Sequence, residues 1–268
     1  MQDSQLLVII IETPNSNRSQ PLVKSLSSDP RFDVVRLPAC MLNTYEDVRF
    51  QNVNVALETF RFLHGRLMSP QEIGCATSHN RARQLLANSF RGGVVLEDDA
   101  RITKVDSFYE TAMAFLEDQS EKSSVLSIND FRKSKYLAIN KKGSQRLMGL
   151  PFLAVSYVAT PSAARALRNA NDPVKTVSDW PRANIKYFSL YMPLALHGDE
   201  LSTIDFDGGL SRKGLKFSIK LSQLTFFSFF TSKPNSLSLL GYIDEVYWSR
   251  LSWHIDLFVR RMIKGFHR

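Results

Sequence analysis

An unbroken apolar run at residues 6–11 sets narrow limits on the fold, because six consecutive Leu, Val and Ile side chains cannot alternate between a buried and a solvated face. Such a run is typical of a strand buried on both faces of a parallel sheet. A turn-forming cluster follows at residues 12–17, then a helical pattern at 18–27 and a second strand pattern at 32–37. The chain therefore opens as a β-α-β unit and predicts an α/β fold with a mostly parallel central sheet flanked by helices.

The next strong signal is a helix start at residues 68–72, where Ser69 is the expected N-cap, Pro70 suits the first helical position and Glu72 completes a capping box. The predicted helix continues to about residue 89. Further elements are expected as strands at 94–96, 124–128 and 190–194, helices at 106–117 and 161–169, and a strand pair formed by 136–139 and 152–158.

The positive charge of the chain is concentrated near its end. The formal net charge is +8, and residues 211–268 hold ten Lys or Arg against three acidic residues, interspersed with Trp and Phe. We expect residues 1–207 to form the catalytic domain and 208–268 a basic, aromatic-rich, helical tail. The tail either contacts an acceptor or an anionic membrane surface, or packs on the body. Charge gathered in a tail argues against nucleic-acid binding, which spreads basic residues over a folded groove.

Neither a secretory signal nor an apolar stretch of about 18 residues is visible. The two cysteines, Cys40 and Cys75, are not spaced like a metal-binding C-x-x-C pair, and two cysteines make no disulfide framework. These features predict a cytoplasmic protein, with the tail as a possible peripheral contact on the inner face of the membrane.

Three consecutive carboxylates, Glu97, Asp98 and Asp99, follow the predicted strand at 94–96. Ligand sites in open α/β sheets lie at the carboxyl ends of strands. Three adjacent like charges are costly unless a positive group compensates them, and Mn²⁺ or Mg²⁺ is a natural partner for carboxylate oxygens. The alternative is an acidic loop in water, and the tripeptide alone does not decide between the two.

The residues that precede the triplet favour the metal site over the acidic loop. Residues 69–79 read S-P-Q-E-I-G-C-A-T-S-H, and a helix and an apolar strand then lead to E-D-D. This combination resembles glycosyltransferase family 25, the bacterial lipopolysaccharide and lipooligosaccharide glycosyltransferases, over roughly residues 5–205. The resemblance implies a GT-A type nucleotide-sugar-binding fold, inversion at the anomeric carbon, a nucleotide-sugar donor that is often UDP-galactose, and a glycan or lipid-linked oligosaccharide acceptor.

The resemblance also suggests roles for the triplet and the preceding helix. Glu97 and Asp99 are expected to hold the divalent cation or the donor, and Asp98 the ribose or sugar. Ser78 and His79 are assigned donor-site or supporting roles, although a lone helical His is more often a packed residue. Arg81, like Arg83, either reaches the diphosphate or lies on a solvated helix face.

Two further residues are predicted from their surroundings. His197 follows a possible edge strand and is a candidate third metal ligand, because imidazole also suits Mn²⁺. An inverting transfer needs a base for the acceptor hydroxyl, and Asp179 is the candidate because it lies in a turn beside Trp180. Asp199 and Glu200 are rivals for the role of base.

Three functions are therefore compared. The first is a metal-dependent inverting glycosyltransferase that acts in lipopolysaccharide biosynthesis. The second is a non-catalytic carbohydrate-binding or scaffold protein that retains the fold, against which the costly acidic triplet argues. The third is a nucleotidyltransferase, but no Gly-rich phosphate loop follows the first strand.

Overall fold

The computed structural model describes residues 5–64, 67–129, 136–139, 144–147, 154–176, 181, 183–190 and 193–197, with the backbone alone at 62–64, 136–139, 144–147 and 197. The chain divides into two units, Met1–Phe60 with Leu67–Gly208, and Arg61–Arg66 with Gly209–Arg268. Everything that follows concerns the first unit. The predicted basic tail at 208–268 lies outside the described residues.

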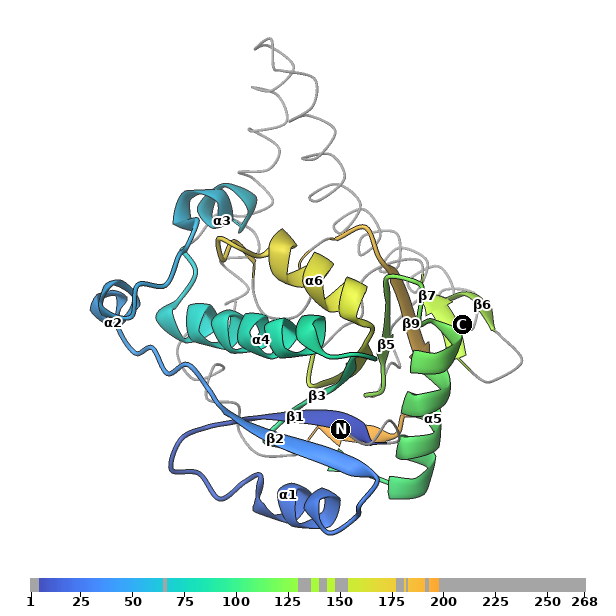
Figure 1. The fold of residues 1–268 in the computed structure, drawn as a ribbon. Coiled ribbons are helices and arrows are strands. Elements are labelled where there is room, and N and C mark those ends of the chain that lie inside the picture. The colour runs from blue at the N-terminus through green and yellow to red at the C-terminus, as the bar shows by residue number, and fades with distance from the viewer. Residues whose placement is uncertain are drawn as a thin grey trace, which may run out of the picture. The chain divides into compact units, whose positions relative to one another are not determined.

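A mixed eight-stranded sheet, in the order β2-β1-β3-β8-β5-β9-β7-β6, forms the centre of this unit (Figure 1). Six of these described strands point in one direction, and β8 and β7 run against them. The prediction of an α/β fold whose strands mostly share a direction is confirmed in this sense. The strands are β1 (Leu6–Glu12), β2 (Phe32–Pro38), β3 (Gly93–Glu97), β5 (Ser124–Ser127), β6 (Tyr136–Ile139), β7 (Ser144–Leu147), β8 (Ser156–Ala159) and β9 (Lys186–Leu190).

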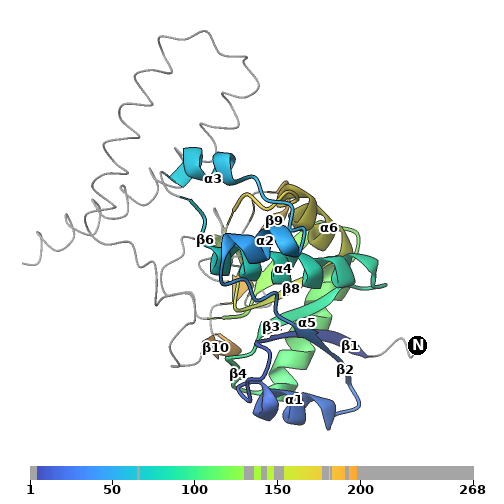
Figure 2. The same cartoon turned by 90° about the vertical axis from the view of Figure 1, so that its left-hand side faces the viewer.

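Helices cover both faces of the sheet. The core clusters place α1 and α5 on one face and α4 and α6 on the other (Figures 1 and 2). A second, two-stranded sheet pairs β4 with β10 in antiparallel fashion. The helices are α1 (Gln20–Ser27), α2 (Tyr45–Phe50), α3 (Leu57–His64), α4 (Pro70–Asn88), α5 (Val105–Asp118) and α6 (Pro161–Ala170), and the two short strands are β4 (Ala100–Ile102) and β10 (Ala195–His197).

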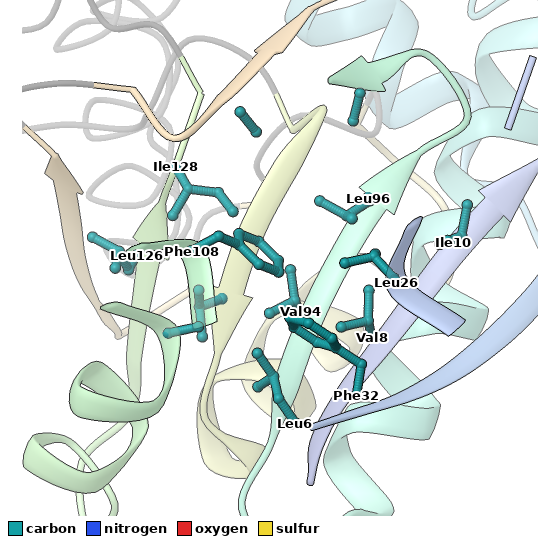
Figure 3. Packing of buried hydrophobic residues seen from close by; sticks show 14 of the residues in the cluster. Leu6, Val8, Ile10, Leu26, Phe32, Val94, Leu96, Phe108, Leu126 and Ile128 are labelled. Atoms are coloured by element: carbon teal, nitrogen blue, oxygen red, sulfur yellow. The ribbon is translucent and has the colours of Figure 1, made fainter. Parts of the chain in front are cut away.

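The continuous apolar run of β1 is explained by burial on both faces. Val8 and Ile10 join Val94, Leu96 and Phe108 in the core beneath α1 and α5 (Figure 3). The alternate residues Ile9 and Ile11 belong instead to the core beneath α4 and α6, where small alanines of both helices let them approach the sheet. Because neither face of the strand meets water, no polar residue interrupts the run.

Helix α4 begins as the sequence predicts. Ser69 Oγ accepts a hydrogen bond from the Glu72 backbone N–H at 3.2 Å, and Glu72 Oε2 accepts one from the Ser69 N–H at 2.8 Å. This capping box satisfies two backbone donors that the first turn of the helix leaves without partners. The capping box therefore fixes the start of α4, the helix that carries His79.

We expect Ser69→Ala to lower the free energy of unfolding by about 1 kcal/mol, because the Glu72 N–H loses its acceptor. Urea denaturation followed by circular dichroism measures the change. Ser25→Ala is the matched control, since Ser25 is an exposed residue within α1. If the two substitutions have the same effect, the capping box does not stabilise the fold.

Two sequence predictions about strands are wrong. Residues 136–139 were expected to pair with 152–158, but β6 pairs with β7, and β8 lies between β3 and β5. A last strand was expected at 190–194, whereas β9 ends at Leu190 and β10 begins at Ala195. The partner of β10, β4, is distant in sequence, so local patterning does not reveal it. The partner of β6 follows closely, but its sequence, S-Q-R-L, lacks the apolar alternation that identifies a strand.

Candidate active site

The acidic triplet lies where β3 ends. Glu97 is the last residue of β3, Asp98 and Asp99 form the turn, and β4 begins at Ala100. Glu97 lies opposite Ile11 of β1 in the parallel register, so the carboxyl ends of two buried strands meet beside the triplet. This is the edge of an α/β sheet at which ligand sites are usually built.

Asp98 and Asp99 share one cation, Arg18, which precedes α1. Arg18 Nη2 lies 3.3 Å from Asp99 Oδ2, and Arg18 Nη1 lies 3.8 Å from Asp98 Oδ1. The Thr13 backbone N–H also donates to Asp98 Oδ2 at 3.2 Å. The two carboxylate side chains are only 10% and 7% exposed, so the guanidinium offsets a repulsion that water screens poorly.

Glu97 has different neighbours, on the α4 side of the sheet. His79 Nε2 lies 3.0 Å from Glu97 Oε1, and His79 Nδ1 lies 3.4 Å from the Tyr157 hydroxyl. Burial lowers the pKa of His79 and so keeps the imidazole neutral, although the Glu97 carboxylate acts in the opposite direction. Burial likewise raises the pKa of Tyr157, so the phenol stays protonated.

A neutral imidazole carries one proton, so its two nitrogens have different roles. Because a carboxylate can only accept, we assign the proton to Nε2, which faces Glu97, and Nδ1 then accepts from the Tyr157 hydroxyl. Arg83, fully buried one turn further along α4, places its guanidinium 5.9 Å from the centre of the Tyr157 ring. The inner face of α4, which packs above β3 and β8, therefore carries the polar side chains of His79 and Arg83. Most buried helix faces carry only apolar side chains.

The remaining predicted residues lie in different places. Ser78 is buried, donates to the Gly74 carbonyl at 2.8 Å and accepts from the Cys40 N–H at 2.7 Å, so its hydroxyl joins α4 to the segment after β2. Arg81 is exposed and lines a cavity of about 480 Å³ on the outer side of α4. Their predicted contacts with the donor remain predictions.

The backbone of His197 is placed close to the triplet. In the β10–β4 ladder, His197 lies opposite Ala100, the residue that follows Asp99. The strand pairing therefore brings two segments almost 100 residues apart to one edge. Asp179 and its rivals Asp199 and Glu200 lie outside the described residues, and their proposed role as base stays a prediction.

Sequence reasoning did not assign site roles to Arg18, Cys75 or Tyr157. The Cys75 thiol, the His79 imidazole and a Glu97 oxygen all lie within 4.8 Å of one another. The four-residue spacing of Cys75 and His79 on one helix was a visible signal. The approach of Arg18 and Tyr157 had no local signal, because each lies about 60 residues or more from the triplet in sequence.

Within the part of the chain that the structure describes, no helix combines the length and apolar character required to cross a bilayer.

Comparison with known proteins finds similar structures but no matching family. No protein-family model and no curated protein matches the chain. Among solved structures, A197 from STIV is 12% identical with a TM-score of 0.37, over 73% of this chain and 87% of A197. The apo-form glycosyltransferase GlyE of Streptococcus pneumoniae TIGR4 is 10% identical with a TM-score of 0.35, over 87% of this chain and 66% of GlyE. Similarity this low assigns neither a family nor a function.

Proposed function

We propose that this chain is a metal-dependent inverting glycosyltransferase of the GT-A type that transfers a sugar from a nucleotide donor to a glycan. One observation carries the proposal: Asp98 and Asp99 are held together, nearly buried, at the carboxyl end of a central strand. Two carboxylates in that position suit a hard divalent cation and the diphosphate that such a cation binds. UDP-galactose is the proposed donor, and a lipopolysaccharide or lipooligosaccharide the proposed acceptor.

The residues at this edge fit Mn²⁺ or Mg²⁺ by their donor chemistry. Asp99 is the proposed principal ligand, with Asp98 beside it, because both already pair with one guanidinium and so define a cation-binding position. His197 is the proposed third ligand, since its backbone lies opposite Ala100. A cation held there neutralises charge on the diphosphate leaving group. Glu97 is directed toward His79 and supports the site from the α4 side.

The chain's own residues supply the other requirements. Arg18 lies beside the two aspartates and would supply the guanidinium that pairs with a phosphate oxygen of the donor. The proposed base, Asp179, takes the proton from the acceptor hydroxyl. The basic tail is proposed to hold the protein at an anionic membrane surface, where a lipid-linked acceptor is found.

A thermal-shift panel tests the proposal. UDP-galactose, UDP-glucose, UDP and UMP are compared with and without Mn²⁺, and with the metal removed by chelation. We expect a diphosphate ligand at about 100 times its Kd to add about 2.7 kcal/mol of stability, but only when the metal is present. A scaffold that merely keeps the fold would show no metal-dependent shift with any nucleotide sugar, and that result would refute the assignment.

A further inference from the structure

Three side chains of different chemistry converge above β3, apart from the Asp98–Asp99 pair. Cys75 and His79 lie one turn apart on the inner face of α4, and Glu97 reaches them from the end of β3. A thiol, an imidazole and a carboxylate provide one sulfur, one nitrogen and one oxygen ligand atom within 4.8 Å of one another. Side chains four residues apart on a helix project from the same face, and such pairs of residues bind zinc in other proteins.

We propose that Cys75, His79 and Glu97 form a binding site for a borderline-soft divalent metal ion, with Zn²⁺ as the expected occupant. This site is distinct from the hard-cation site proposed at Asp98 and Asp99. The proposal does not depend on the glycosyltransferase assignment, because it follows from these three residues alone.

The distances are close to those that zinc requires. Bond lengths of about 2.0–2.1 Å to nitrogen and oxygen and about 2.3 Å to sulfur place tetrahedral ligand atoms about 3.4 Å apart for N and O, and about 3.6 Å apart for S and N. His79 Nε2 and Glu97 Oε1 are 3.0 Å apart, and the Cys75 sulfur lies within 4.8 Å of a ring nitrogen of His79 and of a Glu97 oxygen. Metal binding therefore requires side-chain movements of about 1 Å at most.

The ring of His79 is already oriented for metal binding. When Nε2 binds the metal, the single proton of the neutral imidazole moves to Nδ1, which then donates to the Tyr157 hydroxyl 3.4 Å away. A hydrogen-bond partner on the second ring nitrogen usually fixes the tautomer of a histidine that binds a metal. Tyr157 is itself fully buried between β3 and β5, so its position is firm.

The ligand set also selects the kind of metal. A thiolate and an imidazole favour Zn²⁺ over Mg²⁺ or Ca²⁺, which prefer oxygen ligands alone. A thiolate and a carboxylate together balance the charge of a divalent ion. Glu97 is 27% exposed and Cys75 partly exposed, so a water molecule can complete the fourth position from the solvent side. The metal would join α4 to β3 beside the acidic turn.

The test uses the full-length chain, purified without chelator and dialysed against metal-free buffer. We expect about one equivalent of zinc by elemental analysis. We also expect Co²⁺, added to the chelated protein, to give intense tetrahedral visible bands and a thiolate-to-metal charge-transfer band. Cys75→Ser should remove the charge-transfer band and weaken metal affinity at least tenfold. Cys40→Ser, which changes the second cysteine of the chain, should leave both readouts intact.

Two outcomes would overturn the proposal. One is a chelated wild-type protein, folded by circular dichroism, that takes up no Co²⁺ at micromolar concentrations. The other is a charge-transfer band that survives Cys75→Ser. His79→Gln provides a second variant in case Cys75→Ser fails to fold. Asp99→Asn separates the two metal sites, because it should leave the cobalt spectrum unchanged whether or not the chain transfers sugars.

Discussion

Replacing Asp99 by asparagine is expected to lower metal-dependent turnover of a nucleotide sugar by about 100-fold or more, while the protein stays folded. The amide keeps the shape of the side chain but removes the negative charge that is proposed to bind the cation. Loss of about 3 kcal/mol of transition-state stabilisation corresponds to a factor of about 100 in rate. Release of UDP in the presence of Mn²⁺, with and without acceptor, measures the effect.

The fold should tolerate this change. Asp98 remains as a partner for Arg18, so the guanidinium is not left in a buried site without a counter-charge. Asp33→Asn on β2 is the matched control, because Asp33 is an exposed aspartate remote from the turn. Equal activity of wild type and Asp99→Asn, at saturating Mn²⁺, would show that the metal site is elsewhere.

The second large effect is expected from Gly92→Ala, just before β3. Gly92 has φ of +90°, a conformation that costs other residues about 1–2 kcal/mol. An added Cβ would also overlap the Ala159 carbonyl oxygen of the neighbouring strand, and the two backbones must separate to admit it. Overpacking of this kind costs about 1–3 kcal/mol more. We therefore expect a loss of about 3 kcal/mol or more in the free energy of unfolding.

Chemical denaturation monitored by circular dichroism and tryptophan fluorescence measures this loss. Arg91→Ala is the neighbouring control, since it removes a long side chain without altering the glycine's backbone. The same loss in both variants would show that the backbone conformation of Gly92 is not what matters. Gly92 determines the backbone direction at the start of β3, the strand that ends at Glu97. A folded Gly92→Ala protein should therefore also show weaker metal binding at both proposed metal sites.

Elements defined by local signals were predicted well from the sequence. The apolar run of β1, the capping box of α4 and the Thr160 cap of α6 each rest on residues within a few positions of one another. Strand pairing was predicted less well. Residues 136–139 carry no mark that distinguishes β7 from β8 as a partner, because register depends on turn geometry and on burial by distant elements.

The candidate site shows the same division. The position of the acidic triplet at the end of a central strand followed from its apolar prefix, and the structure places it there. The separation of its members did not follow. Glu97 is the last residue of the strand and meets His79 of α4, whereas Asp98 and Asp99 lie in the turn that follows and meet Arg18. Three consecutive acidic residues in a sequence therefore suggest one site, although here their side chains have two sets of partners.

Because Arg18 pairs with both aspartates, folding of the acidic turn does not require the cation that we propose for this site. The guanidinium is an internal counter-ion for the acidic turn, so we expect a chelated sample to stay folded. A cation that bound as proposed would have to compete with this tethered guanidinium, which would lower its apparent affinity. The proposed function therefore predicts reversible activation by added metal without refolding.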